Sequence, residues 1–320
     1  MLALAGVGCV ALQPAEAVAA PSELPSELGY NYGKQESPRV LAMGGALRAL
    51  SNSTEALYEN PANMAATRVY HFAGVVQLVP QADRQSYGAT AVDSVVSKSR
   101  LAGGVTGVWS QQDSDGLDRK FRDLRLGFAY PFSDNFMFGA SGRYFTLSQE
   151  GPLRLKDGSS HPLRAGTGLV NTEIVKDITF DAGVTLKPIP ELAFAVVGNN
   201  LTDPGHGFLP LQFGAGIGYG NQDFSLEVDA VNDFTTYGDT TSVLMGGGEL
   251  LIADHYSARG GYRYDEALDV SAVSGGIGYV NREFSVDLSV RRSLGELAAT
   301  WIAFGFKYHL ESTGLTGGGY

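Results

Sequence analysis

From residue 68 to residue 310 the chain alternates apolar and polar side chains with a period of two, and turns interrupt the pattern repeatedly. A period of two is typical of β-strands, because successive side chains point to opposite faces of a sheet. The expected fold class is therefore all-β, with about fourteen strands. We place them near residues 69–80, 86–95, 100–111, 120–131, 135–148, 176–187, 191–200, 210–219, 223–232, 241–251, 255–264, 271–280, 283–291 and 297–310.

The polar face of these strands mixes glycine with single charged residues, and the other face is apolar. A soluble sandwich buries its apolar face against a second sheet, whereas a transmembrane barrel turns that face to lipid and its polar face to the lumen. The pattern favours a transmembrane antiparallel β-barrel over a soluble sandwich or propeller, and no repeat of propeller-blade length is visible. Both signs of charge occur in similar numbers, so we expect pairing across the lumen. The predicted lumen-facing charges are Asp123, Arg125, Arg143, Asp181, Lys187, Glu227, Asp229, Glu249, Arg259, Arg263, Asp287, Arg291 and Lys307.

Short turns and longer loops alternate along the strands, as they do in outer-membrane barrels with short periplasmic turns and longer outer loops. Aromatic residues flank the short turns, for example Tyr219 and Phe224, where a periplasmic aromatic girdle is expected. A second girdle near the outer ends would use Trp109, Tyr144, Tyr262 and Tyr264. We therefore expect a multi-pass barrel in the outer membrane of a Gram-negative bacterium, in contact with outer-membrane lipids and lipopolysaccharide.

The N-terminal region supports export. Residues 1–19 are typical of a signal peptide, with an apolar run at Leu2–Leu12 and a small-residue cleavage site at Ala17-Val18-Ala19. We divide the remainder into an N-terminal periplasmic segment at 20–67, a barrel at 68–310 and a C-terminal tail at 311–320. The formal net charge of −11 argues against nucleic acid as a partner.

Residues 40–66 are the one long stretch before the C-terminus that lacks the strand pattern. Residues 21–39 are expected to be an extended entry. A short helix should follow, capped by Asn52 or Ser53, and Asn60-Pro61 should end it, because proline cannot continue a helix.

This stretch carries a resemblance. Met43–Ala65, MGGALRALSNSTEALYENPANMA, resembles the N-terminal signature of the FadL-type (FadL/TodX-like) outer-membrane hydrophobic-compound transporters and their PorV-type relatives. The motif Asn60, Pro61, Ala62 is intact, and Ala56-Leu57-Tyr58 precedes it at the usual offset, whereas Asn63-Met64 replaces the common Gly-Leu. Val196–Pro204, VVGNNLTDP, is similar to a segment of the PorV-type branch.

The resemblance implies a fourteen-stranded barrel whose N-terminal segment folds into the lumen as a hatch. If the chain is like the transporters, the resemblance implies passive uptake of small hydrophobic molecules such as long-chain fatty acids. In the PorV-type branch it implies a non-transporting scaffold or anchor, with protein partners in an envelope machinery for secretion, adhesion or gliding motility. Both functions remain open at this point.

If the protein is a transporter, its hydrophobic ligand needs an apolar pocket with a few polar groups. The predicted ligand-binding residues are Leu57, Tyr58 and Met64 of the hatch, Phe145 and Trp301 of the wall, and Arg143 or Arg263 for a carboxylate head. We expect no enzyme: the sequence offers no catalytic residues, no metal ligands in a recognised spacing and no cofactor motif.

Overall fold

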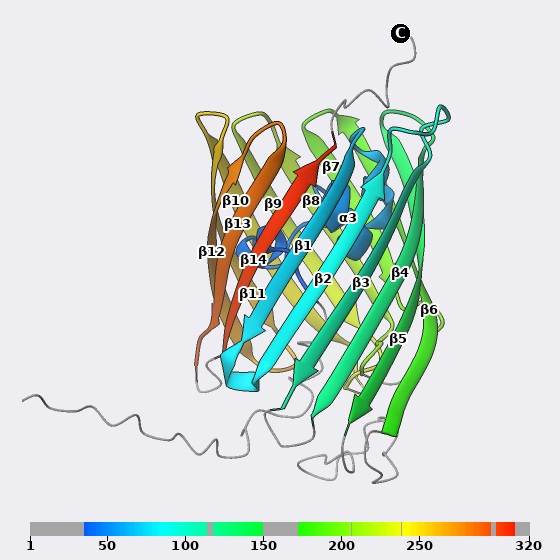
Figure 1. Ribbon diagram of the computed structural model, residues 1–320, viewed down its shortest axis with the longest axis vertical. Helices are drawn as coiled ribbons and strands as arrows, with labels where there is room; N and C mark the ends of the chain where they lie inside the picture. The colour runs from blue at the N-terminus through cyan, green and yellow to red at the C-terminus, as the bar shows by residue number, and fades with distance from the viewer. Residues whose placement is uncertain are drawn as a thin grey trace, which may run out of the picture.

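A computed structural model of the protein describes residues 35–113, 118–149, 172–205, 207–237, 239–295 and 299–310. The predicted signal peptide, residues 20–34 and the C-terminal tail lie outside these ranges. Fourteen antiparallel strands close into one barrel, in which each strand pairs with its neighbours in sequence and β1 pairs with β14 (Figure 1). The strands are β1 (Tyr70–Val79), β2 (Arg84–Asp93), β3 (Ala102–Gln112), β4 (Arg119–Pro131), β5 (Phe136–Gln149), β6 (Thr172–Ile189), β7 (Leu192–Asn199), β8 (Gln212–Gly220), β9 (Phe224–Asp233), β10 (Thr241–Ile252), β11 (Tyr256–Asp265), β12 (Val270–Val280), β13 (Phe284–Ser293) and β14 (Thr300–His309). The predicted fold class is confirmed.

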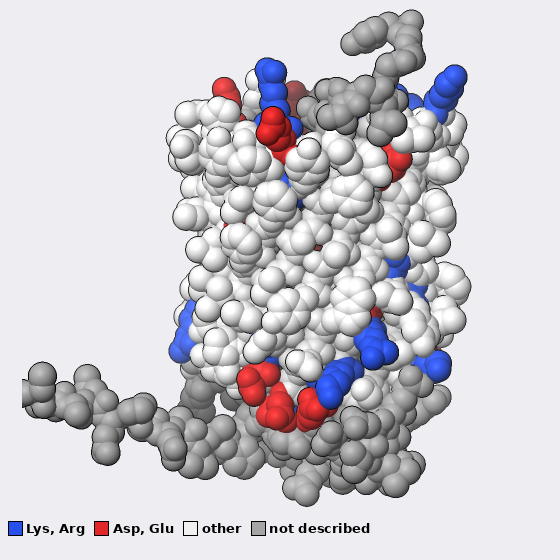
Figure 2. All heavy atoms as spheres, viewed as in Figure 1, with Lys and Arg blue, Asp and Glu red and all other residues white. Residues whose placement is uncertain are grey.

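The barrel is apolar outside and polar inside. On β4, Leu126 is 55% exposed and Phe128 53%, whereas Asp123 and Arg125 between the apolar positions are buried at 4%. The outer surface shows a broad band with few charged side chains, and charges gather toward the two ends (Figure 2). Closure leaves no unpaired strand edge, which is what a sheet surrounded by hydrocarbon requires.

The two ends of the barrel differ. β14 ends and β1 begins at one end, uppermost in Figure 1, which we call the periplasmic end. Tight connections at residues 190–191, 221–223 and 281–283 lie there, as predicted. The opposite end, which we call the outer end, carries the short 3-10 helix η2 (Pro80–Ala82) and longer connections such as residues 200–211.

From residue 35, where the described part of the N-terminal segment begins, three short helices lie inside the barrel: α2 (Pro38–Ala42), α3 (Ser53–Glu59) and the 3-10 helix η1 (Pro61–Ala65). No helix among the described residues is long and apolar enough to cross a membrane. The predicted helix is present as α3, with Asn52 at its N-cap position. The prediction that residues 21–39 are extended is wrong for residues 38 and 39, which belong to α2. Pro38 opens α2, since its missing N–H costs nothing at a helix start, and Ser37 Oγ accepts a hydrogen bond from Val40 N.

Candidate functional site

Residues 35–66, which we call the hatch, cross the lumen and touch the wall on every side. Helix α2 packs on β11–β14, η1 on β3–β6, and α3 on β1–β3. The loop between α2 and α3 contacts β8–β11 through the close approaches and hydrogen bonds described next. The lumen is therefore divided into two chambers, one on each side of the hatch.

Glycines of the wall give the hatch room to approach. A Cβ built on Gly139 of β5 would collide with the backbone of Pro61 and Ala62, and one on Gly261 of β11 with the backbone at Gly44. Only a glycine allows two backbones to come this close. The glycines that the alternation assigned to a polar lumen face are thus contact points for the hatch, a role that the sequence did not reveal.

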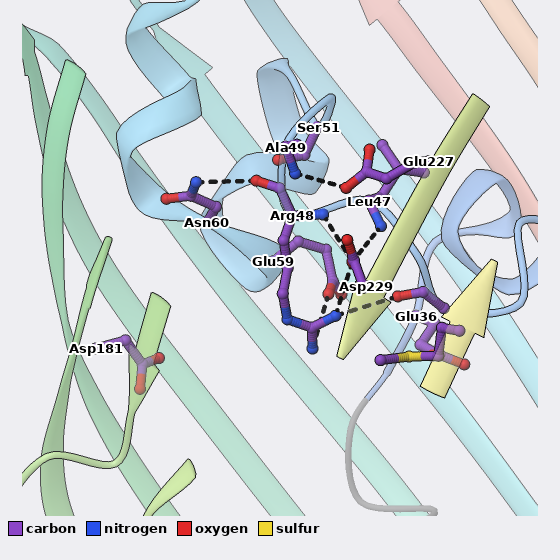
Figure 3. Close-up of polar contacts among 12 residues, drawn as sticks. Glu36, Leu47, Arg48, Ala49, Ser51, Glu59, Asn60, Asp181, Glu227 and Asp229 are labelled. Atoms are coloured by element: carbon purple, nitrogen blue, oxygen red, sulfur yellow. Dashed lines mark hydrogen bonds and ion pairs between the residues drawn. The ribbon is translucent and has the colours of Figure 1, made fainter. Parts of the chain in front are cut away.

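Two wall carboxylates hold the loop at residues 47–50. Asp229 accepts hydrogen bonds from the backbone N–H groups of Leu47 and Arg48 at 3.0 and 3.1 Å. Glu227 accepts from those of Ala49 and Leu50 at 2.6 and 2.9 Å (Figure 3). Both carboxylates are 1% exposed. Four successive backbone donors are thus satisfied by charged acceptors, which form the stronger class of hydrogen bond.

The Asn-Pro-Ala motif ties η1 to the same loop. Asn60 Nδ2 donates to Arg48 O at 2.9 Å and to Thr185 Oγ1 of β6 at 2.8 Å (Figure 3 shows the first), and its Oδ1 accepts from Ala62 N. Asn63 Nδ2 also donates to Arg48 O, at 3.0 Å. The motif therefore fixes the internal geometry of the hatch. Asn63, which departs from the family signature, contributes to that geometry.

The predicted charge pairing is present, but much of it joins the hatch to the wall. The wall–wall pairs include Arg125 with Asp123 at 3.0 Å and Arg259 with Asp287 at 2.5 Å. The hatch–wall pairs are Glu36 with Arg291 (2.7 Å), Arg39 with Glu249 (3.0 Å), Arg48 with Asp229 (3.0 Å) and Glu55 with Lys307 (2.8 Å). Burial by itself would raise the pKa of Glu55, but Lys307 and Arg39 outweigh it and the pKa is lowered.

The outer chamber is a cavity of about 180 Å³ between the hatch and the outer end of the barrel. Four of the seven predicted ligand-binding residues line it: Tyr58, Arg143, Arg263 and Trp301. Its apolar lining includes Phe208, Val231, Val243, Met245, Leu268 and Val270. The chamber therefore combines apolar side chains with several arginines and acidic residues, and is more polar than the apolar pocket with a few polar groups that was expected.

Arg143 and Arg263 differ in how fully they are engaged. Arg143 Nη2 lies 2.7 Å from Asp123, and its Nη1 donates to Asn200 Oδ1 at 3.1 Å. Arg263 Nη2 lies 3.8 Å from Asp265, and its side chain is 28% exposed to the chamber. Arg263 is therefore the better placed of the two to meet an incoming anion.

The other three predicted residues pack elsewhere. Leu57 and Met64 belong to a buried cluster between the hatch and the wall, with Val92 among its members. Phe145 lies in a second cluster near the outer end, together with Phe208 and other residues. Phe208 comes from the connection at residues 200–211, and its large apolar side chain within a loop was the signal that sequence analysis missed.

The inner chamber, a cavity of about 440 Å³, lies between the hatch and the periplasmic end. Its lining is rich in paired ions. Arg39 and Arg259 both bind Glu249, Arg259 also binds Asp287, and Lys307 binds Glu55. His71 and His309 stack at its edge with ring centroids 4.3 Å apart.

Neither a protein-family model nor a curated protein matches this sequence significantly. Solved structures do match it. The CymD monoaromatic hydrocarbon channel is 17% identical with a TM-score of 0.63, over 86% of this chain and 97% of that chain. The Ralstonia pickettii toluene transporter TbuX is 16% identical with a TM-score of 0.61, over 85% and 98%. A Pseudomonas aeruginosa FadL homologue is 15% identical with a TM-score of 0.56, over 86% and 98%.

These likenesses confirm the resemblance at the level of fold. The chain has the FadL-type fold, a fourteen-stranded barrel with a short N-terminal helical segment in its lumen. The apolar outer band of this barrel is the surface that a transmembrane barrel turns to lipid.

Proposed function

We propose that this protein is a passive outer-membrane channel for small hydrophobic molecules that carry a carboxylate, fatty acids among them. The observation that carries the proposal is the outer chamber, where Arg263 faces a lining that mixes apolar side chains, Trp301 and Leu268 among them, with polar ones. An apolar ligand body would pack on that lining while its carboxylate meets the guanidinium, which binds carboxylates through two parallel N–H groups. The proposal includes no chemical step.

The volume of the chamber limits which ligands can fit. At about 180 Å³ it is smaller than the roughly 300–1,000 Å³ of typical small-molecule sites. It would hold a compact acid whole, but only the head and first carbons of a long chain. The volume therefore favours short aromatic or aliphatic acids over long-chain ones, and Arg263 favours them over the neutral monoaromatic compounds named for some of the matching channels.

The experiment compares an acid with its alcohol. In cells that depend on this channel, Arg263→Gln should reduce uptake of a limiting medium-chain fatty acid by about tenfold or more. A hydrogen bond to a charged group contributes roughly 1.5–3 kcal/mol. Uptake of the alcohol of the same length should stay within about twofold, because neutral ligands gain less from the charge.

Arg292→Gln provides the matched control, because Arg292 is an exposed arginine of β13 that does not line the chamber. Equal loss of acid uptake in both variants, or none in Arg263→Gln, would contradict the carboxylate assignment. Unchanged uptake after deletion of the whole gene would contradict transport itself.

A non-transporting scaffold is the second candidate. It is favoured by the four ion pairs that join the hatch to the wall, because a permanently sealed barrel has no need to move its hatch. Recovery of a stoichiometric envelope complex together with unchanged uptake in the deletion strain would support it.

A further inference from the structure

The lipid-facing surface at the outer end of β4–β6 carries a row of basic residues. Arg122 of β4 pairs in register with Thr146 of β5, and Thr146 pairs with Lys176 of β6. Arg122 and Lys176 are both exposed. Because neighbouring strands are about 4.8 Å apart, the two cations rise from backbone positions roughly 10 Å apart.

The depth of this row follows from the strand pattern. On β4 the lipid-facing residues from Tyr130 at the periplasmic end to Leu124 are apolar, and Arg122 is the next one outward. Trp109 of β3 pairs in register with Arg122, faces lipid and is 49% exposed. Tryptophan prefers the boundary between hydrocarbon and headgroups. The row therefore lies at the headgroup level of the outer leaflet.

One sign of charge predominates on the lipid-facing surface near the outer end. In the outer halves of the strands, the lipid-facing charged side chains that the structure describes are all basic, although the whole chain has a net charge of −11. They are Lys120, Arg122, Lys176 and Arg292. Three of the four lie on β4 and β6, and basic side chains gather at the lower right of the view in Figure 2, over this part of the wall.

We propose that Arg122, Lys176 and Trp109 form a binding site for a phosphorylated glycolipid of the outer leaflet, the lipid A part of lipopolysaccharide. The cations would bind its phosphates. Its acyl chains would lie along the apolar residues on the periplasmic side of the row, such as Leu124 and Ile178, both exposed to lipid. Charge complementarity and depth both select this partner over a neutral lipid. The site is independent of the outer chamber and of the transport proposal.

The test uses the two tryptophans of the chain. In a Trp301→Phe background, Trp109 is the sole tryptophan, and lipid A with brominated acyl chains should quench its fluorescence on binding to the full-length protein in detergent micelles. Each surface cation contributes about fivefold to the affinity for an anionic lipid, so Arg122→Ala/Lys176→Ala should weaken binding about 25-fold. Dephosphorylated lipid A should bind weakly to both proteins.

Two controls keep the result interpretable. Arg292→Ala removes an exposed cation from β13, on another part of the wall, and should change binding less than twofold. The exchange Arg122→Lys/Lys176→Arg keeps both charges and should bind as the parent does. Equal quenching by phosphorylated and dephosphorylated lipid A, or an equal loss in Arg292→Ala, would overturn the proposal.

Discussion

The two chambers of the lumen share one barrel wall and one hatch, and both contain closely paired arginines, such as Arg291 with Glu36 in the outer one, but they differ in one side chain, Arg263. In the outer chamber Arg263 lies 3.8 Å from its acidic partner and faces apolar side chains. In the inner chamber Arg39, Arg259 and Lys307 are each held by carboxylates at 3.0 Å or less. A loosely paired cation beside apolar side chains can select a ligand, whereas closely paired ions mainly fix structure.

The hatch supplies partners for wall charges on both of its sides. Toward the periplasm the hatch supplies partners for wall charges, as Glu55 does for Lys307. Toward the outer end it presents Gly45 and Tyr58 to the cavity, together with Glu36 and Arg48. These two charged residues also pair with the wall, Glu36 with Arg291 and Arg48 with Asp229. The hatch therefore divides the lumen and supplies charged partners on both sides, and the chambers differ in Arg263, whose partner Asp265 belongs to the wall and lies 3.8 Å away.

The largest expected effect comes from removing this boundary. Deletion of Arg39–Ala65 should leave a folded barrel, because β1 and β14 close the wall without the hatch. The two chambers would merge, and the protein should conduct ions in planar bilayers as an open pore does. Heat-dependent mobility on a denaturing gel verifies that the barrel has folded. A folded deletion variant with the conductance of the parent would refute the role of the hatch as a seal.

A smaller effect is expected from disturbing one contact of the hatch. Gly261→Val would place a side chain in the space that the backbone at Gly44 occupies, so the hatch must shift on that side. Overpacking of this kind costs about 1–3 kcal/mol, which predicts roughly fivefold to a hundredfold more frequent channel openings.

Gly142→Val is the matched control on the wall. A Cβ at Gly142 meets only the ring of Phe180 at 3.8 Å, on the lipid face. We expect its opening frequency to equal that of the parent. The same increase in both variants would show that wall glycines matter for the barrel and not for the hatch.

Much of this comparison could be predicted from the sequence, and part of it could not. Alternation along the strands gave the barrel and the lumen-facing charges, because a period of two is a local property. The resemblance at Asn60-Pro61-Ala62 gave the hatch. Arg143 and Arg263 differ in how fully their guanidinium groups are engaged. This difference depends on contacts with residues tens of positions away, such as Asn200, and no local pattern encodes it.

The wall glycines illustrate the same limit. Gly139 and Gly142 look alike in sequence, three residues apart on one strand. Alternation places them on opposite faces of β5, but it does not show that the backbone of Pro61 and Ala62 comes up against the first. Similarly, the loop residue Phe208 joins the outer chamber because residues 200–211 bond to β6, where Asn200 N donates to Asp181.

The smallest expected effect concerns the inner side of the hatch alone. The Glu55 carboxylate accepts from Lys307 Nζ at 2.8 and 3.0 Å, and despite burial its pKa is lowered by Lys307 and Arg39. A pKa below the unfolded value means that the charged pair stabilises the docked hatch above a pH of about 4.3, and that this stabilisation is lost as the pH falls toward the folded pKa. Channel openings should therefore become more frequent in acid.

Glu55→Gln should raise the opening frequency at neutral pH about fivefold, because a neutral acceptor loses roughly 1 kcal/mol relative to a charged one. It should also flatten the rise in acid, since the titrating group is gone. Asp287→Asn is the matched control, because Asp287 also lines the inner chamber but pairs with Arg259 of the wall. If both variants changed the single-channel record alike, the inner ion pairs would act on the barrel as a whole. If only Glu55→Gln does, the hatch–wall pair holds the boundary between the chambers.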